Sequence, residues 1–389
     1  MDYRQNRWLL WPIMILLLVF SLDKLAFLPV YKNSVLYWKK IEPAIYQSRQ
    51  DLFHQLKTKH YRKGAWKDKK LGLILGSSRS SGFDSDYIAQ KIPNSYTYNF
   101  SAPFTSPAYY DYWLETLLAA GIRPDFVLLE LDAAVFNAQA IDYQLSYSFD
   151  LDFVWRHTDL YRPHLRDVWL SRGKGFGWSE LEAWLARHWI GFYRYPFKPG
   201  NIEANYTRTW LPDPDSALGM REIRRLDFRE YVQPLIQQVN EKKLGGIPNI
   251  FFVQVPPDQL ATDALHMAER DLKHFQADPT QVIFARNLLE RLARSGIPVI
   301  IYMPVVSNEF YPYYKKYKVK ENFNEPFARL LASIQAQYPD FRVFVRDLNE
   351  SASFSCRQFQ DSYHLSGPCF PTLTDQLITS SFLQAVNRN

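Results

Sequence analysis

The chain has 389 residues, of which 47% are hydrophobic and 22% charged, a composition that is typical of a folded globular protein and excludes a disordered one. The aromatic share of 16% suits surfaces that bind ligands through ring stacking. The formal net charge of +6 favours anionic membranes or polyanionic glycans as partners and also permits nucleic acid, so charge alone does not choose among them.

An apolar run, WLLWPIMILLLVF, occupies residues 8–20 and follows two arginines. Its place behind these charges favours a membrane anchor over the alternative, a buried helix of a soluble protein. No small-residue cleavage site follows the run, so we expect an uncleaved, single-pass signal anchor over residues 1–30, with Asp23 and Lys24 near its outer end. The bulk of the chain would then lie outside the cytoplasm, in the periplasm, where nucleic acid is not a partner.

Residues 31–70 are polar, basic and aromatic, and lysines crowd their C-terminal end. We interpret them as a stalk that leads from the anchor, in the inner (cytoplasmic) membrane, to a folded domain over residues 71–389.

A short apolar run, LGLIL at residues 71–75, is followed by Gly76-Ser77-Ser78-Arg79-Ser80 and then by a helix pattern over 84–92. This order predicts a strand, a tight turn and a helix, with Ser78 at the mouth of the helix. Backbone N–H groups and the helix dipole at that place stabilise negative charge on a substrate carbonyl oxygen, as an acyl-transfer nucleophile requires. The alternative is a purely structural serine that caps the helix.

Strand-length apolar runs alternate with helix patterns through the rest of the domain. Further strands are predicted at 95–99, 126–131, 250–255, 298–303 and 341–345, and helices at 107–120, 264–275, 279–295, 324–337 and 371–386. Such alternation predicts an α/β fold with a mostly parallel sheet covered on both faces and a ligand beyond the carboxyl ends of its strands. Between about 136 and 248 the alternation breaks, and we interpret this aromatic and basic stretch as a helical insertion.

The two cysteines, Cys356 and Cys369, bracket a segment that contains His364. In an oxidising compartment a disulfide between them would close a short loop and contribute on the order of 3 kcal/mol. The alternative is two unrelated buried thiols. The spacing is not that of a CxxC pair, so the cysteines predict no metal site.

Asp361-Ser-Tyr-His364 lies just before the last predicted helix. With this spacing the carboxylate can accept the imidazole N–H and fix its tautomer, which leaves the other ring nitrogen to take a proton from a serine. His54 and His274 have an aspartate at the same spacing, but one lies in the predicted stalk and the other inside a helix pattern. The alternative for His364 is a surface or capping histidine.

A Gly-x-Ser after the first strand and an Asp-x-x-His before the last helix resemble the SGNH or GDSL hydrolase superfamily. In place of that family's Gly-Asp-Ser motif the chain has Gly76-Ser77-Ser78, similar to DltD-type membrane-anchored proteins that handle acyl groups on envelope polymers. The resemblance covers about residues 71–135 and 250–386. It implies a three-layer, flavodoxin-like sandwich with Ser78 as nucleophile, His364 as general base and then acid, and Asp361 as its orienting partner.

The groups expected to stabilise an oxyanion depart from this pattern. The family uses a glycine and the asparagine of a Gly-x-Asn-Asp motif, whereas this chain reads FSAP after its second strand and LDAA after its third. The expected substitutes and other candidates for oxyanion or substrate contact are the backbone N–H groups of Ser101 and Ala102, and the side chains of Asn99, Asn137 and Arg79.

The resemblance implies an extracytoplasmic serine esterase or O-acyltransferase that acts on an envelope polysaccharide or lipid through an acyl-enzyme. It also implies a membrane protein that supplies the acyl donor as a partner, and no metal or organic cofactor for the chemical step. The alternative is a non-catalytic SGNH-like protein that binds or scaffolds envelope components.

Overall fold

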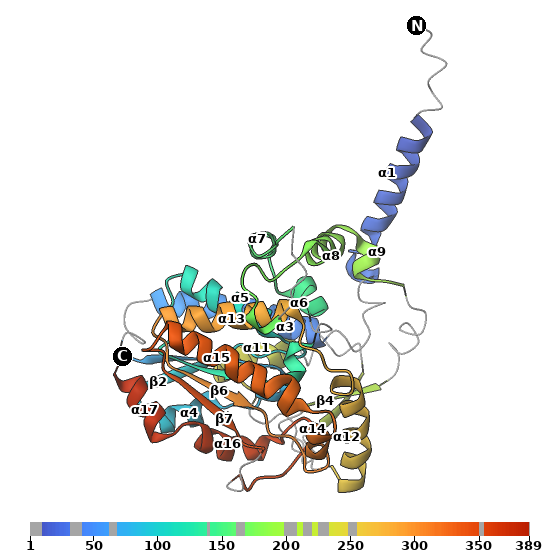
Figure 1. Cartoon of the computed structure of the whole chain (residues 1–389). Helices are drawn as coiled ribbons and strands as arrows, with labels where there is room; N and C mark the ends of the chain where they lie inside the picture. Colours follow the sequence, from blue (N-terminus) through green and yellow to red (C-terminus); the bar gives the residue numbers. More distant parts are fainter. Residues whose placement is uncertain are drawn as a thin grey trace, which may run out of the picture.

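A computed structural model describes residues 10–31, 41–61, 68–137, 141–160, 168–197, 208–212, 220–224, 233–247, 255–349 and 354–388. The protein is an α/β fold around one parallel sheet, and a long helix projects from its body (Figure 1).

The central sheet has five parallel strands in the order β2-β1-β3-β6-β7. Its strands are β1 (Lys70–Leu75), β2 (Ser95–Asn99), β3 (Phe126–Glu130), β6 (Val299–Met303) and β7 (Val343–Asp347). Five of the predicted strands are confirmed within two residues. The three central strands, β1, β3 and β6, are almost continuously apolar, as parallel strands need when both faces are covered. The predicted strand at 250–255 lies almost wholly outside the described residues.

A separate antiparallel pair is formed by β4 (Arg208–Pro212) and β5 (Met220–Arg224). The helices before residue 200 are α1 (Leu10–Leu25), α3 (Ile41–Tyr61), α4 (Ser85–Lys91), α5 (Pro107–Ala119), α6 (Ile141–Tyr147), α7 (Leu151–Arg156), α8 (Trp178–Trp189) and α9 (Gly191–Arg194). The later ones are α11 (Gln233–Lys243), α12 (Pro257–Asp271), α13 (Pro279–Arg294), α14 (Tyr311–Lys316), α15 (Glu325–Gln337), α16 (Phe370–Leu377) and α17 (Ser380–Asn387). The single helix predicted at 371–386 is thus two helices.

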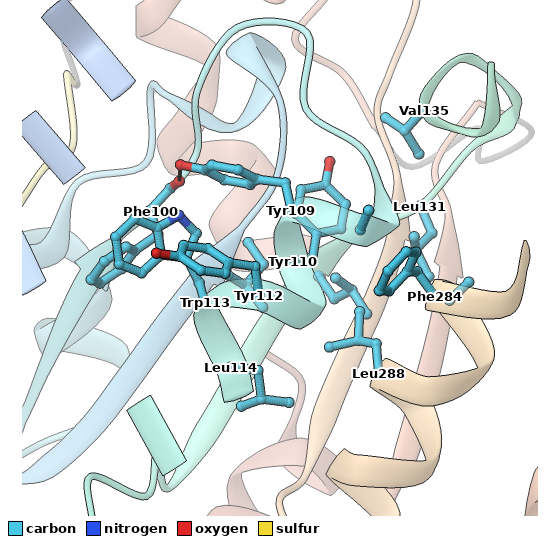
Figure 2. Packing of buried hydrophobic residues seen from close by; sticks show 14 of the residues in the cluster. Phe100, Tyr109, Tyr110, Tyr112, Trp113, Leu114, Leu131, Val135, Phe284 and Leu288 are labelled. Carbon is cyan, nitrogen blue, oxygen red and sulfur yellow. Dashed lines mark hydrogen bonds between the residues drawn. The ribbon is translucent and has the colours of Figure 1, made fainter. Parts of the chain in front are cut away.

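Successive residues of each strand point to opposite faces of the sheet, and each face has its own core. Leu73 and Leu75 of β1 pack with α5, α13 and α15, and Figure 2 shows the aromatic part of this core around Trp113. Ile74, between them, packs with α4, α16 and α17 on the other face. Trp113 is fully buried, with its ring centroid 4.7 Å from that of Phe100. Helices therefore cover both faces, as predicted.

The segment interpreted as a stalk differs from that prediction. Residues 41–61 form α3, which packs on the domain through the buried side chains of Tyr46, Leu52 and Leu56. The fully buried guanidinium of Arg49 donates to the carbonyl oxygen of Ser101 at 2.9 Å. This helix therefore belongs to the folded domain.

The apolar N-terminal run forms α1, whose side chains are exposed except for Asp23 and Lys24 near its end. Within the described ranges, no helix has both the length and the apolar character that crossing a membrane requires.

Candidate active site

Ser78 lies just beyond the carboxyl end of β1, at the start of a 3-10 turn over Ser78–Ser80. The preceding Ser77 is in an extended conformation and caps the turn, since its Oγ accepts a hydrogen bond from the Arg79 N–H at 3.2 Å. Ser77, Arg79 and Ser80 are buried, whereas Ser78 is partly exposed. A buried turn therefore presents Ser78 at the end of the strand.

His364 meets Ser78 from the other end of the chain. Its Nε2 lies 2.8 Å from the Ser78 Oγ, and its Nδ1 lies 2.7 and 2.9 Å from the two carboxylate oxygens of Asp361. An ionised carboxylate only accepts hydrogen bonds, so Nδ1 carries the proton and Nε2 is left to accept one from the serine. The three side chains thus have the relative placement that a serine nucleophile, its base and an orienting carboxylate require.

Asp361 is held by the backbone as well as by the imidazole. Its Oδ1 accepts hydrogen bonds from the N–H groups of Tyr363 at 2.8 Å and His364 at 2.7 Å. Burial raises the pKa of Asp361, but the nearby His364 and these N–H groups lower it by more, so the pKa lies below its ordinary value. The carboxylate is therefore ionised at neutral pH.

The predicted disulfide between Cys356 and Cys369 is confirmed, with 5.4 Å between the two Cα atoms. It closes the loop that carries Asp361 and His364. Inside this loop Phe359 pairs with Leu365 as an isolated antiparallel bridge. The covalent link and the bridge together fix the segment that presents the imidazole.

Beneath Ser78 lies a buried ionic cluster that the sequence did not predict. The carboxylate of Glu130, at the end of β3, accepts hydrogen bonds from the Ser77 N–H at 2.9 Å, the Ser77 Oγ at 2.6 Å, the Ser80 hydroxyl and the Arg79 guanidinium at 2.9 Å. Asp132 accepts from the same guanidinium at 2.6 and 2.7 Å. Glu130 is fully buried. One carboxylate thus ties the turn that carries Ser78 to the centre of the sheet.

Gly76 makes this close approach possible. A Cβ atom at Gly76 would lie 1.9 Å from the Ser80 Oγ and 2.8 Å from a carboxylate oxygen of Glu130. Any side chain at this position would therefore push the turn away from the cluster.

Arg79 lies at the edge of the site, but its guanidinium belongs to the cluster. Burial lowers the pKa of Arg79, but Asp132 and Glu130 raise it by more, so its pKa lies well above the ordinary value. Its guanidinium is engaged by these two carboxylates and stays charged. The expectation that Arg79 contacts an oxyanion does not fit this geometry.

Three other predicted oxyanion groups are also used within the fold. The Ser101 N–H donates to Asn99 Oδ1 at 3.0 Å, and the Ala102 N–H donates to the Gly76 carbonyl oxygen at 3.2 Å. The side-chain amide of Asn99 donates to the Ser80 carbonyl oxygen at 2.9 Å. Asn99, Ser101 and Ala102 support the Ser78 turn from behind, so the expectation that they form an oxyanion hole does not fit the geometry either.

A cavity of about 290 Å³ opens in front of Ser78. It is lined by Ser77, Ser78, Arg79, Phe104, Thr105, Ala134, Val135, Asn137, Tyr143, Met267, Arg270, Asp271, Tyr363 and His364. On its wall the rings of Phe104 and Tyr143 stack with their centroids 5.7 Å apart. Phe104 is half exposed and has a φ of +54°, a strained conformation for a bulky residue. The two rings thus form an aromatic surface on the cavity wall.

Ser78 and Asn137 both line this cavity and both carry N–H donors. Within the described part of the chain, the Ser78 N–H has no hydrogen-bond partner. The Asn137 side chain also lines the cavity, and its Nδ2 makes one long contact of 3.5 Å with the Asp271 carbonyl oxygen. Of the candidates named from the sequence, Arg79 and Asn137 both line the cavity, and Asn137 is the one that takes no part in the ionic cluster.

A family model described as "protein of unknown function (DUF1574)" matches residues 4–380. The chain belongs to this family. No curated protein matches the sequence.

In this DUF1574 family member, one cluster of the described residues has the donor atoms of a metal site. Asp111, Glu115 and His157 bring their ligand atoms within 4.8 Å of one another. The guanidinium of Arg291 already bonds Asp111 at 3.0 Å and also contacts Glu115, and Arg156 bonds Glu115 from another side. These arginines supply the positive charge, so the cluster fits an internal ion-pair network better than a divalent cation.

The sequence did carry a signal for the ionic cluster that it failed to predict. Glu130 is the last residue of β3, Asp132 lies two residues further on, and Arg79 directly follows Ser78. The carboxyl ends of neighbouring parallel strands lie at the same edge of a sheet. The positive charge of Arg79 after β1 and the negative charges of Glu130 and Asp132 at the end of β3 are therefore expected to lie close together.

Proposed function

We propose that the protein is an SGNH-type serine acyl-esterase or O-acyltransferase that acts outside the cytoplasm on a cell-envelope glycan or lipid. The observation that carries the proposal is the alignment of Ser78, His364 and Asp361 at a cavity, with 2.8 Å between the Ser78 Oγ and the His364 Nε2. A serine that only caps a helix has no need of an oriented imidazole.

The chemistry follows from this alignment. Ser78 Oγ attacks the ester carbonyl carbon while His364 Nε2 takes the serine proton. The protonated imidazole, stabilised by Asp361, gives that proton to the departing alcohol oxygen as the ester C–O bond breaks. Water or an acceptor hydroxyl then attacks the acyl-enzyme, His364 takes its proton, and Ser78 recovers it as the product leaves.

The oxyanion of this reaction would be stabilised by the Ser78 N–H and the Asn137 Nδ2, which belong to residues that line the cavity. Loss of one such donor costs about 10²–10³ in rate. The Asn137 contribution can be measured separately, because Asn137 has no part in the ionic cluster that holds the turn.

The fold is compatible with this assignment. Numbered along the chain, the sheet strands have the order 2-1-3-4-5, which is the flavodoxin-like order. In such sheets the ligand binds where the order reverses, between β1 and β3, and the cavity in front of Ser78 is lined by residues that follow these two strands. The three-layer SGNH sandwich implied by Gly76-Ser77-Ser78 is therefore part of the proposal.

The location and substrate class rest on three features. The disulfide favours an oxidising compartment. The exposed apolar α1 suits a single-pass anchor in the inner membrane, and the Phe104–Tyr143 pair suits stacking on a sugar ring or packing on an acyl chain. A membrane protein that delivers the acyl group is the partner this arrangement calls for, and the chemical step requires no metal or organic cofactor.

One observation favours a non-catalytic binding or scaffold protein instead. The amides of Ser101 and Ala102 that could complete an oxyanion hole are used within the fold. In that case the aligned side chains would hold a ligand without forming an acyl-enzyme.

The two functions are separated by reactivity at Ser78. The full-length protein is treated with a serine-reactive fluorophosphonate, and the adducts are located by mass spectrometry. The proposal predicts an adduct on Ser78 that is lost in Ser78→Ala and His364→Ala but kept in His274→Ala, a control histidine that also follows an aspartate by three residues. Folded wild-type protein that stays unlabelled would support the scaffold.

A further inference from the structure

Exposed apolar side chains gather on the helical insertion. We define the α8–α9 aromatic patch as Trp189, Ile190, Phe192, Tyr193 and Phe197, which are between 43% and 66% exposed. In the described part of the chain beyond residue 30, the exposed large hydrophobic residues that lie outside residues 151–197 are Phe104, Leu265 and Val345. Single exposed apolar residues are ordinary on a protein surface, whereas a concentration of this kind marks an interaction surface.

The patch is joined to the base of α1 by hydrogen bonds. The Asp23 carboxylate, buried near the end of α1, accepts from the backbone N–H groups of Gly191 at 2.8 Å and Phe192 at 3.0 Å. The Lys24 ammonium donates to the Trp189 carbonyl oxygen. Charged side chains of α1 thus form hydrogen bonds with the backbone at the end of α8 and the start of α9, and they join α1 to these helices.

Ring contacts continue this joint. The Tyr31 ring meets the edge of Phe192 at a centroid distance of 5.5 Å, and the Tyr31 hydroxyl donates to the Tyr195 carbonyl oxygen at 3.1 Å. Gly191 is needed for the close approach, since a Cβ atom there would lie 2.3 Å from the Asp23 carbonyl oxygen. The apolar run of α1 therefore ends where the patch begins.

We infer that the α8–α9 aromatic patch lies in the headgroup region of the same lipid bilayer that receives α1. Figure 1 places α7, α8 and α9 on the side of the body from which α1 projects. If α1 enters a bilayer, its outer end at Asp23 lies at the membrane surface, and the fixed joint brings the patch to that level. Tryptophan and tyrosine are the residues that favour this depth, because their rings are apolar and their N–H or O–H groups are polar.

The bilayer is favoured over a protein partner because it is continuous with the surroundings of α1. A protein on the patch would have to fit between the body and the membrane beside the base of α1. The inference rests on the proposed anchor and is independent of the proposed chemistry at Ser78.

The test uses the full chain in nanodiscs of phosphatidylcholine and phosphatidylglycerol. Single cysteines at Trp189→Cys and Phe197→Cys carry an environment-sensitive fluorophore, with Leu265→Cys and Val345→Cys as exposed apolar controls outside the patch. The two native cysteines are bonded to each other, so they do not compete for the label. Leu17→Cys reports whether α1 itself enters the bilayer.

The inference predicts that brominated lipids quench most of the fluorescence at positions 17, 189 and 197 and leave positions 265 and 345 unchanged. Quenching at 17 without quenching at 189 and 197 would overturn it. So would patch labels that are shielded from aqueous iodide but unaffected by brominated lipid, because a protein surface would then cover them. An unquenched label at position 17 would contradict both the membrane anchor and the inference that rests on it. Fluorophosphonate labelling of Ser78 in the same nanodiscs would still test the proposed chemistry.

Discussion

At the scale of single residues, the position of Ser78 depends on the buried carboxylate of Glu130. This side chain accepts hydrogen bonds from the backbone and hydroxyl of Ser77, from the Ser80 hydroxyl and from the Arg79 guanidinium. In a glutamine at this position, the side-chain NH2 group would face the N–H and O–H donors that now bond the carboxylate. The buried guanidinium of Arg79 would then have Asp132 as its one charged partner in the cluster.

We therefore expect Glu130→Gln to lower the free energy of unfolding by about 3–5 kcal/mol, as breaking a buried ion pair does. It should also slow fluorophosphonate labelling of Ser78, because the turn loses its support. Denaturant unfolding and labelling rates measure the two effects. The matched control is Asp375→Asn, which breaks a partly exposed pair with Lys91 and should change little. An unchanged unfolding free energy in Glu130→Gln would contradict this role.

Asp361 is expected to act through the imidazole and to have no direct contact with substrate. Asp361→Asn keeps the shape but offers an N–H or a weaker acceptor to Nδ1, which favours the wrong tautomer of His364. We expect the labelling rate at Ser78 to fall by about 10⁴-fold, as in serine proteases in which asparagine replaces this carboxylate. Asp258→Asn, on the exposed side of α12, is the control. A rate that falls equally in both variants would indicate a general effect on folding.

The oxyanion donors illustrate what the sequence could not provide at this scale. Ser101 and Ala102 follow β2 at the correct edge of the sheet, so their choice from the sequence was reasonable. Whether an N–H points into a cavity or into the fold depends on the local path of the backbone, and both N–H groups point inward. The roles of Ser78, His364 and Asp361 remain predictions, but the residues that the sequence paired do lie together.

At the scale of elements, the disulfide is the main constraint on the loop that presents His364. The bond spans 13 positions of sequence, which corresponds to about 3 kcal/mol of chain entropy removed from the unfolded state. Replacing Cys356 and Cys369 by alanine should lower the free energy of unfolding by up to this amount and should slow labelling at Ser78. Denaturant unfolding and the rate of fluorophosphonate labelling at Ser78, both measured without a reducing agent on the wild type and the double variant, test this. Equal stability with and without the bond would show that the Phe359–Leu365 bridge is sufficient.

The contact between α5 and α13 includes an ion-pair network that makes stability depend on pH. Burial raises the pKa of Glu115, but His157, Arg156 and Arg291 lower it by more, to about 2. A carboxylate with a lowered pKa stabilises the fold fully above its unfolded pKa, near 4.5, and loses this contribution as the pH falls toward about 2. Burial raises the pKa of the neighbouring Asp111, which acts in the opposite direction.

Glu115→Gln removes the contribution of Glu115 and also relieves part of the rise in the pKa of Asp111, to which the Glu115 charge contributes. The variant should be less stable than the wild type at pH 7 by a few kcal/mol, and the difference should shrink as the pH falls below about 4.5. Urea unfolding at several pH values measures this difference. Glu182→Gln, an exposed change on α8, serves as the control. A difference that is the same at pH 7 and pH 3 would contradict the assignment.

At the scale of the whole molecule, the sheet was predictable and the surroundings of α3 were not. Runs such as LGLIL and VIIYM are apolar throughout, because strands covered on both faces expose nothing. The buried residues of α3 are sparse among lysines, glutamines and histidines, so its sequence resembles a solvated segment. Only its packing partners in the fold identify it as part of the domain.

The contact between α1 and α9 could not be predicted from the sequence for a similar reason. In the sequence, Asp23 near the end of the apolar run indicated only where the predicted membrane anchor ends. Its partners, Gly191 and Phe192, lie far away in the insertion, and no local pattern connects them. The orientation of α1 relative to the insertion depends on this long-range contact.

The central claim is that His364 activates Ser78 to carry an acyl group. The most direct measurement is mass spectrometry of the protein after brief exposure to an activated acetyl ester, with Ser78→Ala and His364→Ala treated in parallel. The account predicts acetyl on the Ser78 peptide of the wild type and its absence at this position in both variants. Acetyl found only on surface lysines, or equal acetylation of Ser78 with and without His364, would contradict it.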